Sequence, residues 1–166
     1  MILWQTFIES LQLPKKQALF KLNLKGMDTV VFYLFILLLI VSIPSLLDRI
    51  DANSTSDLNM HVFFLLIYFF IFYYLPLNVF VFALLTLIAY IGLGISKLMK
   101  RKLRFSILWK MSAFTTTIPF LIYTMIALFF PIRDTYLVLT ILYTLMMLIK
   151  MISIYPKRKE RKKASS

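Results

Sequence analysis

The chain lacks cysteine altogether, has a single histidine, His61, and holds only seven Asp and Glu residues among 166. The missing cysteine excludes disulfides, thiolate metal sites and cysteine nucleophiles. His61 lies four residues after Asp57, and a solvated loop position is favoured for it over a metal or proton-relay role. We therefore expect neither a metal nor another cofactor.

Hydrophobic residues, in contrast, make up 61% of the chain and aromatic residues 16%. A soluble domain is about 45–50% apolar, and here the excess gathers in long uncharged runs that read as membrane spans. The net charge is +12. Its basic residues flank the apolar runs, and no soluble module is present to carry them, so a nucleic-acid partner is not expected.

These runs predict an all-α integral membrane protein with four transmembrane helices. The spans are placed at about 29–47, 77–96, 112–131 and 135–155. Residues 1–28 form a cytoplasmic amphipathic segment, 48–61 a polar loop, and 156–166 a basic, disordered cytoplasmic tail. Pro44 suggests a kink or a stop near the end of the first span. That span is expected to be retained, because 41–47 offers only a poor signal-cleavage site.

Residues 62–96 carry no charge and would form a helix about 52 Å long, against a hydrocarbon core of about 30 Å. Two spans here would place the six basic residues of 97–110 outside, so a single crossing is predicted. Residues 62–75 then form an aromatic helix in the outer leaflet or its interface, bent at Pro76. One long kinked helix over 62–96 remains the alternative.

This arrangement places 17 of the 19 basic residues on one side of the membrane, with only Arg49 and Arg133 on the other. Basic residues are retained on the cytoplasmic side. We therefore predict a multi-pass protein of the bacterial cell membrane with both termini in the cytoplasm. Membrane lipids, anionic ones above all, are the expected partners of the basic flanks. The candidate contacts are Lys15, Lys16, Lys100, Arg101, Lys102 and Arg104.

The N-terminal segment 2–25 has helical periodicity. One apolar face is formed by Ile2, Leu3, Trp4, Phe7, Ile8 and Leu11. Four lysines follow, interleaved with leucines, which is typical of helices that lie on a membrane surface. We predict one or two short surface helices whose apolar face contacts the membrane, the alternative being that this face packs on the protein's own helices.

No Asp, Glu or His falls inside a predicted span, so the acid–base and nucleophile pairs of an intramembrane enzyme are missing and no enzyme is expected. The candidate polar residues within the membrane are Asn78, Thr115, Thr116 and Thr117. Asn78 could line a groove or satisfy backbone that Pro76 leaves free. The threonines precede Pro119 and indicate either a kink or a hydroxyl-lined patch. Lys150 is expected to snorkel to the cytoplasmic interface.

Small residues near the end of the second span suggest close helix packing. Gly92 and Gly94 are the candidate packing positions, together with Ala89 and Ser96 on the same stretch.

Two stretches resemble a family of Gram-positive bacterial multi-span membrane proteins of unknown function. They are TFIESLQLPKKQALFKLNLKG, with its Pro14–Lys15 turn, and KLMKRKLRFSILWKMSAFTTTIPFLI, in which a basic loop precedes Ser112 and Pro119. Some members are described as maltodextrin-utilisation proteins, and the family is similar to the Yip-type group. The resemblance covers the first and last parts of the chain and implies no catalytic residue. Members carry a sizeable external domain between spans 1 and 2, where this chain has only a short polar stretch.

Two functions are predicted from these features. The first is a non-enzymatic accessory or regulatory subunit of a larger membrane complex, such as a transporter, which requires a membrane-protein partner or self-association. The alternative is a small transporter or lipid-handling protein, with Asn78, the threonine run and Tyr90 lining a path. The alternative predicts polar residues that meet in one cavity between spans, whereas a subunit predicts an exposed groove or flat face.

Overall fold

The computed structural model describes residues 2–55, 61–101, 103–130 and 135–156. Within these ranges every regular element is a helix. Four helical runs are long and apolar enough to cross a membrane, namely Met27–Asn53, Val62–Leu98, Phe105–Ala127 and Thr135–Ile154. The prediction of an all-α, four-span membrane protein is therefore confirmed. Residues 157–166 of the predicted basic tail, Arg133 and Lys102 lie outside the described residues.

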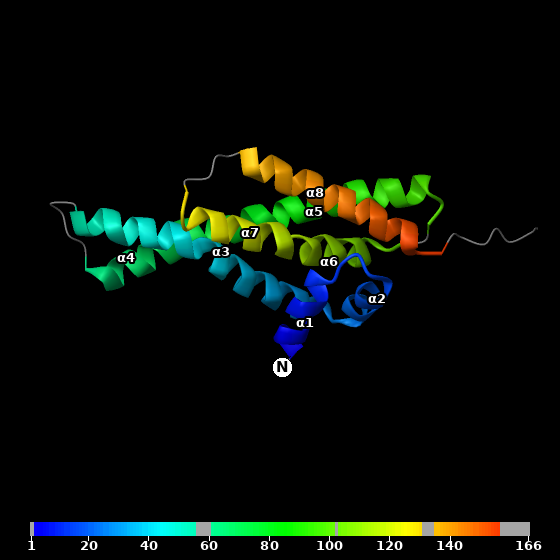
Figure 1. Ribbon diagram of the computed structural model, residues 1–166, viewed down its shortest axis with the longest axis horizontal. Helices are drawn as coiled ribbons and strands as arrows, with labels where there is room; N and C mark the ends of the chain where they lie inside the picture. The colour runs from blue at the N-terminus through cyan, green and yellow to red at the C-terminus, as the bar shows by residue number, and fades with distance from the viewer. Residues whose placement is uncertain (1, 56–60, 102, 131–134, 157–166) are drawn as a thin grey trace, which may run out of the picture.

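The spans form an elongated bundle (Figure 1). In chain order the elements are α1 (Ile2–Leu11), α2 (Lys16–Leu24), α3 (Met27–Thr55), α4 (Val62–Phe69), the π-helical segment η1 (Phe70–Tyr74), α5 (Leu75–Leu98), α6 (Phe105–Thr115), α7 (Thr117–Ala127) and α8 (Thr135–Ile154). The closest pairs are α5 with α6 and α3 with α7, while α8 packs on α5 and α6. The short helices α1 and α2 lie against the side of this bundle.

Helix α3 is longer than the sequence indicated. It passes through Pro44, which membrane helices tolerate, and continues to Thr55, so the first part of the predicted polar loop 48–61 is helical. The guanidinium of Arg49 lies 5.9 Å from the ring centre of Phe69 and 5.4 Å from that of Tyr73. These cation–π contacts link the end of α3 to the next helical run. They help explain why the first part of the predicted loop is helical.

Residues 62–98 form one uninterrupted helical run. His61 begins it as an N-cap, because its Nδ1 accepts a hydrogen bond from the Phe63 backbone N–H at 3.3 Å. Pro76 has no N–H to donate to the Phe72 carbonyl, and the wider π-helical turn of η1 accommodates this loss. The backbone therefore has the form of the long-helix alternative, while the position of 62–75 relative to a membrane stays a prediction.

The third span begins earlier than the predicted residue 112. Helix α6 starts at Phe105, so Lys110, which was assigned to the basic loop, is part of the helix. The run ends at Ala127 rather than at 131. The charge of Lys110 hid this helix start from the hydrophobicity pattern, because a long apolar run ordinarily excludes lysine. The fourth span, α8, covers Thr135–Ile154 against the predicted 135–155.

Candidate functional site

The helix break at Thr115–Thr117 sends three neighbouring hydroxyls in different directions. Helix α6 ends at Thr115 and α7 begins at Thr117, two residues before Pro119. The Thr115 hydroxyl donates to the Met111 carbonyl at 2.8 Å, and the Thr116 hydroxyl donates to Ala113 at 2.7 Å. The Thr117 hydroxyl instead lies 2.8 Å from the Tyr33 hydroxyl of α3. The run is therefore a kink whose members serve separate contacts, not one joint patch of hydroxyls.

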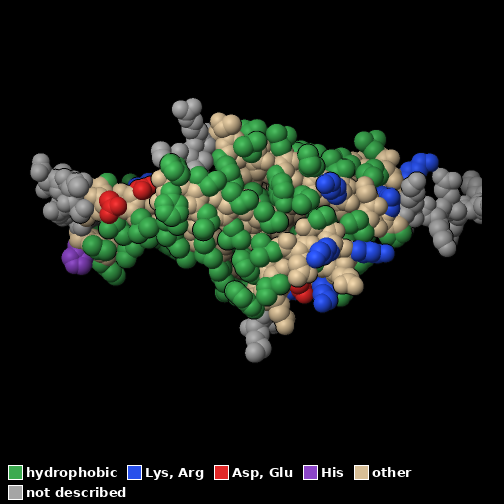
Figure 2. Space-filling model, viewed as in Figure 1, with side chains coloured by type: hydrophobic (Ala, Val, Ile, Leu, Met, Phe, Trp, Pro, Cys, Tyr) green, Lys and Arg blue, Asp and Glu red, His purple; other side chains and the backbone are tan. Residues whose placement is uncertain are grey.

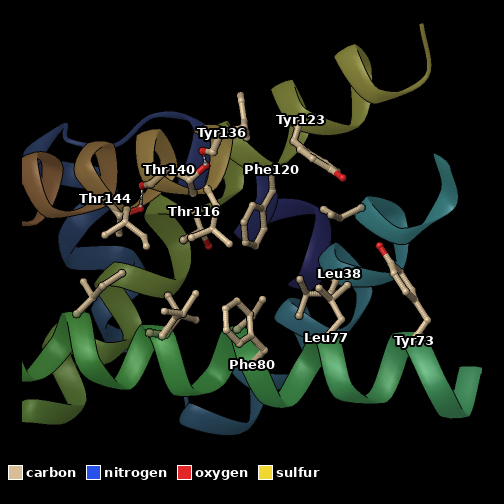
Figure 3. Close-up of a pocket in the computed structure, with 17 residues that line it drawn as sticks. Leu38, Tyr73, Leu77, Phe80, Thr116, Phe120, Tyr123, Tyr136, Thr140 and Thr144 are labelled. Carbon is tan, nitrogen blue, oxygen red and sulfur yellow. Dashed lines mark hydrogen bonds between the residues drawn. The ribbon is translucent and has the colours of Figure 1, made fainter. Parts of the chain in front are cut away.

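A cavity of about 460 Å³ lies between α3 and residues 66–74. Only Thr116 of the three threonines borders a second cavity of the bundle, which has a volume of about 350 Å³. The cavity lies between α3, α5, α7 and α8 (Figure 3). Most of its wall is apolar, with side chains such as Leu38, Phe80, Leu85 and Phe120. Hydroxyls come from Tyr73, Thr116, Tyr123, Tyr136, Thr140 and Thr144. A mostly apolar pocket with a few polar groups and a volume of about 300–1,000 Å³ is the usual form of a small-molecule site.

Most of these hydroxyls already have partners within the protein. Thr140 and Thr144 donate to the carbonyls one helical turn earlier, at 3.0 and 2.8 Å. Tyr136 donates to the Pro119 carbonyl at 2.7 Å and thereby links α8 to α7. Because these three protons are used internally, Tyr136, Thr140 and Thr144 offer a ligand only acceptor oxygens, and the apolar surface of the wall dominates.

The cavity has two different ends. Figure 3 shows Tyr73 and Tyr123 at one end and Thr144 at the other. The Tyr73 hydroxyl lies 2.8 Å from the Ser45 hydroxyl, and the Tyr73 ring carries the Arg49 guanidinium on its face. The tyrosine end is therefore polar and close to a positive charge, whereas the Thr144 end lies deep in the bundle.

A side opening joins the cavity to the outer surface of the protein. Phe80 of α5 and Leu137 of α8 line the cavity, yet 50% and 42% of their surfaces are exposed. Both side chains therefore line the cavity and also reach the outer surface of the spans, so the cavity is open toward that surface near them. In a membrane protein a sideways opening faces lipid chains and not water.

Asn78 does not line this cavity. It is buried, and its Nδ2 donates to the Tyr74 carbonyl at 2.7 Å, a bond within its own helical run. Its Oδ1 is buried and has no partner among the described residues. Tyr90, the other residue expected along a path, is exposed and packs on Phe105 instead, with ring centres 5.0 Å apart.

The two candidate packing glycines differ. A Cβ added to Gly92 would lie 2.5 Å from Cδ2 of Leu148, so the absence of a side chain lets α5 and α8 approach here. A Cβ added to Gly94 would meet no atom within 4 Å. Only Gly92 is thus a packing position within this chain.

The candidate lipid-contact residues gather at one end of the molecule, where Figure 2 shows the basic side chains. Lys15, Lys16, Lys100 and Arg104 are exposed there, and Arg101 is half-buried. Lys100 has a φ of 51°, and the Arg101 N–H donates to the Ser96 carbonyl at 2.9 Å. Lys100 thus occupies the left-handed position of a helix C-cap that usually favours glycine.

Lys110 is a functional residue that sequence reasoning missed. Its ammonium donates to the backbone carbonyls of Asn23 at 2.6 Å and Lys25 at 3.0 Å. Both carbonyls belong to the end of α2, where a helix has unsatisfied acceptors and a negative dipole end. Lys110 therefore fastens the N-terminal segment to the third span.

The same end is closed by aromatic packing. The rings of Phe20 in α2 and Tyr155 after α8 lie 5.5 Å apart. Burial raises the pKa of Tyr155 to about 12, so its phenol is neutral at physiological pH.

Among the residues that the structure describes, no three His, Asp or Glu side chains form a group that could hold a metal ion. Comparisons with protein-family models, with curated proteins and with solved structures gave no match. The resemblance to a Gram-positive membrane-protein family therefore stays a prediction.

Proposed function

We propose that this chain is a non-enzymatic lipid-handling protein that holds the apolar chain of a membrane amphiphile in the cavity between its spans. The observation that carries the proposal is the cavity of about 350 Å³, whose lining residues Phe80 and Leu137 are also exposed on the outer surface of the spans. The sequence-based alternative predicted polar residues that meet in one cavity, and of the residues named for it only Thr116 borders this cavity. Its apolar wall favours a hydrophobic chain over an ion or a sugar.

The size of the cavity favours a slender occupant. One turn of an α-helix with its side chains is 10–12 Å across and 5.4 Å long and fills about 400–600 Å³. The cavity is smaller than one such turn. A partner helix therefore does not fit inside, whereas part of a slender acyl chain does, with the rest of the chain outside the cavity.

The two ends of the cavity give the bound molecule a direction. Its polar head lies at the end formed by Tyr73 and Tyr123, where Arg49 supplies a positive charge suited to a phosphate. Its tail points toward Thr144. Since the basic residues gather at the opposite end of the bundle, this head belongs to a lipid of the leaflet farther from them.

The charge distribution supports a bacterial cell membrane as the location, with the basic end in the cytoplasm. Four crossings then return both termini to that side. The exposed Lys15, Lys16, Lys100 and Arg104 are suited to contacts with anionic headgroups of the cytoplasmic leaflet.

The proposal is tested by filling the cavity. Thr140 lies in its wall, so Thr140→Trp is expected to displace the chain, while Leu142→Trp on the exposed face of the same helix is the matched control. Wild-type and variant proteins are reconstituted in lipid nanodiscs, extracted gently and examined by native mass spectrometry. Wild type and Leu142→Trp should retain one lipid, and Thr140→Trp should lose it by about tenfold, or about 1.4 kcal/mol. Equal lipid retention in all three proteins would contradict the proposal.

The exposed face of α8 favours a second candidate, the accessory subunit. In the most apolar window of this span only 22% of the residues are buried, against 56% in Phe105–Ala127. Its exposed stripe consists of Val138, Leu142, Met146 and Ile149. Such a face suits a helix of a larger membrane protein. Affinity purification in mild detergent tests it: a stoichiometric membrane partner that Leu142→Trp removes supports the subunit, and purification of the chain alone contradicts it.

A further inference from the structure

Helix α1 buries two hydroxyl side chains and exposes one apolar stripe, while Leu3 and Phe7 of its apolar face pack on the core. Thr6 and Ser10 are completely buried, and the Ser10 hydroxyl donates to the Thr6 carbonyl at 2.7 Å. On the outer side, Trp4 is 67% exposed, Ile8 40% and Leu11 41%. These three residues follow the i, i+4, i+7 spacing of one helical stripe. An apolar stripe of this kind is unfavourable in water, because it leaves large apolar side chains hydrated.

A set of polar contacts fixes the rotation of α1 about its own axis. The Lys25 ammonium pairs with the Glu9 carboxylate at 2.9 Å and donates to the Thr6 hydroxyl at 2.7 Å. Lys110 in turn holds the carbonyl of Lys25. Glu9 and Thr6 lie on the inner side of α1, so these bonds oppose any rotation that would bury the outer stripe.

The place of α1 on the bundle identifies what covers the stripe. Helix α1 lies across the long axis of the spans, not along it (Figure 1). It contacts α3, α6 and α7. Phe32 of α3 and Ile122 of α7 are strongly exposed on the apolar surfaces of two of these neighbours. The stripe thus joins surfaces that spans present to lipid chains.

Charge places the helix near the membrane boundary. Figure 2 shows hydrophobic side chains over the middle of the molecule and basic ones at the end that carries α2. The exposed lysines Lys15, Lys16 and Lys21 follow α1 directly. An apolar helical face followed by exposed lysines is typical of helices that lie in the plane of a lipid leaflet.

We propose that α1 lies in the plane of the membrane within the leaflet on the basic side, with Trp4, Ile8 and Leu11 among the acyl chains of the lipids. The polar side chains of α1 find their hydrogen-bond partners within the protein and do not need to face water. The occupant of the stripe is therefore lipid, and the proposal is independent of what the central cavity binds.

The two tryptophans of the chain allow a direct test with the full-length protein. Trp109→Phe leaves Trp4 as the only indole, and Trp4→Phe leaves the buried Trp109 as the comparison. Each variant is reconstituted in phosphatidylcholine–phosphatidylglycerol vesicles with or without bromine on the acyl chains. The emission of Trp4 should be quenched strongly by brominated lipid and hardly by aqueous iodide. The emission of Trp109 should be quenched less than that of Trp4 by each of the two quenchers. Quenching of Trp4 by iodide alone would overturn the proposal, since the stripe would then face water. Resistance to both quenchers would also overturn it, since protein would then cover the stripe.

Because the chain has no cysteine, spin labels at single introduced cysteines provide a second measurement that keeps both tryptophans. Ile8→Cys places the label on the stripe, and Gln5→Cys places it at an exposed polar position of the same helix. A label at residue 8 should collide more with dissolved oxygen, which concentrates in lipid, and a label at residue 5 more with a water-soluble nickel complex. Equal nickel accessibility at both positions would refute the placement.

Discussion

At the basic end of the bundle, α5 and α8 approach so closely that Gly92 has no room for a Cβ beside Leu148, whereas farther along the same two helices border a cavity of about 350 Å³. The difference arises from side-chain size at the contact. A glycine allows the backbones to come together, while the other half has large side chains such as Phe80, Leu137 and Tyr136 around the cavity. The closed half fixes the helices, and the open half keeps space between them.

The polar contacts follow the same division. In the closed half, Lys110 joins the end of α2 to α6, and the Lys25–Glu9 pair joins α1 to the end of α2. In the open half, α8 is linked to α7 by the bond from Tyr136 to Pro119 and by the Tyr123–Tyr136 rings, whose centres lie 5.6 Å apart. The close α5–α8 packing and the cavity thus lie at opposite ends of one bundle.

The largest effect is expected from enlarging the closed contact. Gly92→Leu should destabilise the bundle by about 3 kcal/mol, because the inserted side chain forces Leu148 out of its place. Unfolding in detergent, followed by circular dichroism, measures the change. Gly94→Leu is the matched control and should be nearly silent, since its Cβ meets open space. Equal losses in both variants would mean that the close approach of Gly92 to Leu148 does not govern the effect.

A smaller loss is expected from Lys110→Met, which removes the donor to the carbonyls of Asn23 and Lys25. Leaving these acceptors unsatisfied should cost about 2 kcal/mol. The loss should appear as faster hydrogen exchange in α1 and α2 than in α8. Lys150→Met, at an exposed position, is the control. If exchange in α1 and α2 stays at the wild-type rate, Lys110 does not hold the segment.

The smallest effect is expected from Thr140→Leu in the open half. The larger side chain enters existing space, so the unfolding free energy should change by less than about 1 kcal/mol. Measured beside Gly92→Leu, this variant tests directly whether the two halves are packed differently. A loss of unfolding free energy as large as that in Gly92→Leu would show that the two halves are packed equally tightly.

Sequence was sufficient for the parts of the fold that depend on composition. Long uncharged runs set the four spans, because a membrane tolerates few charges within them. The start of α6 was not predicted, because Lys110 places a charge inside the span. Its ammonium is accommodated there by a backbone carbonyl of a distant segment. The helical periodicity of the N-terminal segment predicted the apolar stripe of α1. It did not predict which residues of the protein contact the opposite side of this helix.

The candidate site was harder to predict because it depends on relations between helices. Thr116 borders the cavity only because the break before Pro119 turns it away from Thr115 and Thr117. Asn78 is polar and membrane-embedded in sequence terms, yet its bond to Tyr74 keeps it out of the cavity. The cavity itself results from side-chain volumes on several helices, and no single segment encodes that sum.

The run Val62–Leu98 has 37 residues and is therefore about 55 Å long, well beyond the roughly 30 Å of hydrocarbon in an ordinary bilayer. It consists of uncharged residues as far as Ser96. Such hydrophobic mismatch is relieved by tilting the helix or by thickening the bilayer around it, at a cost of fractions of a kcal/mol per Å. The length of this run makes lipid chain length a variable to which the tilt of the helix is expected to respond.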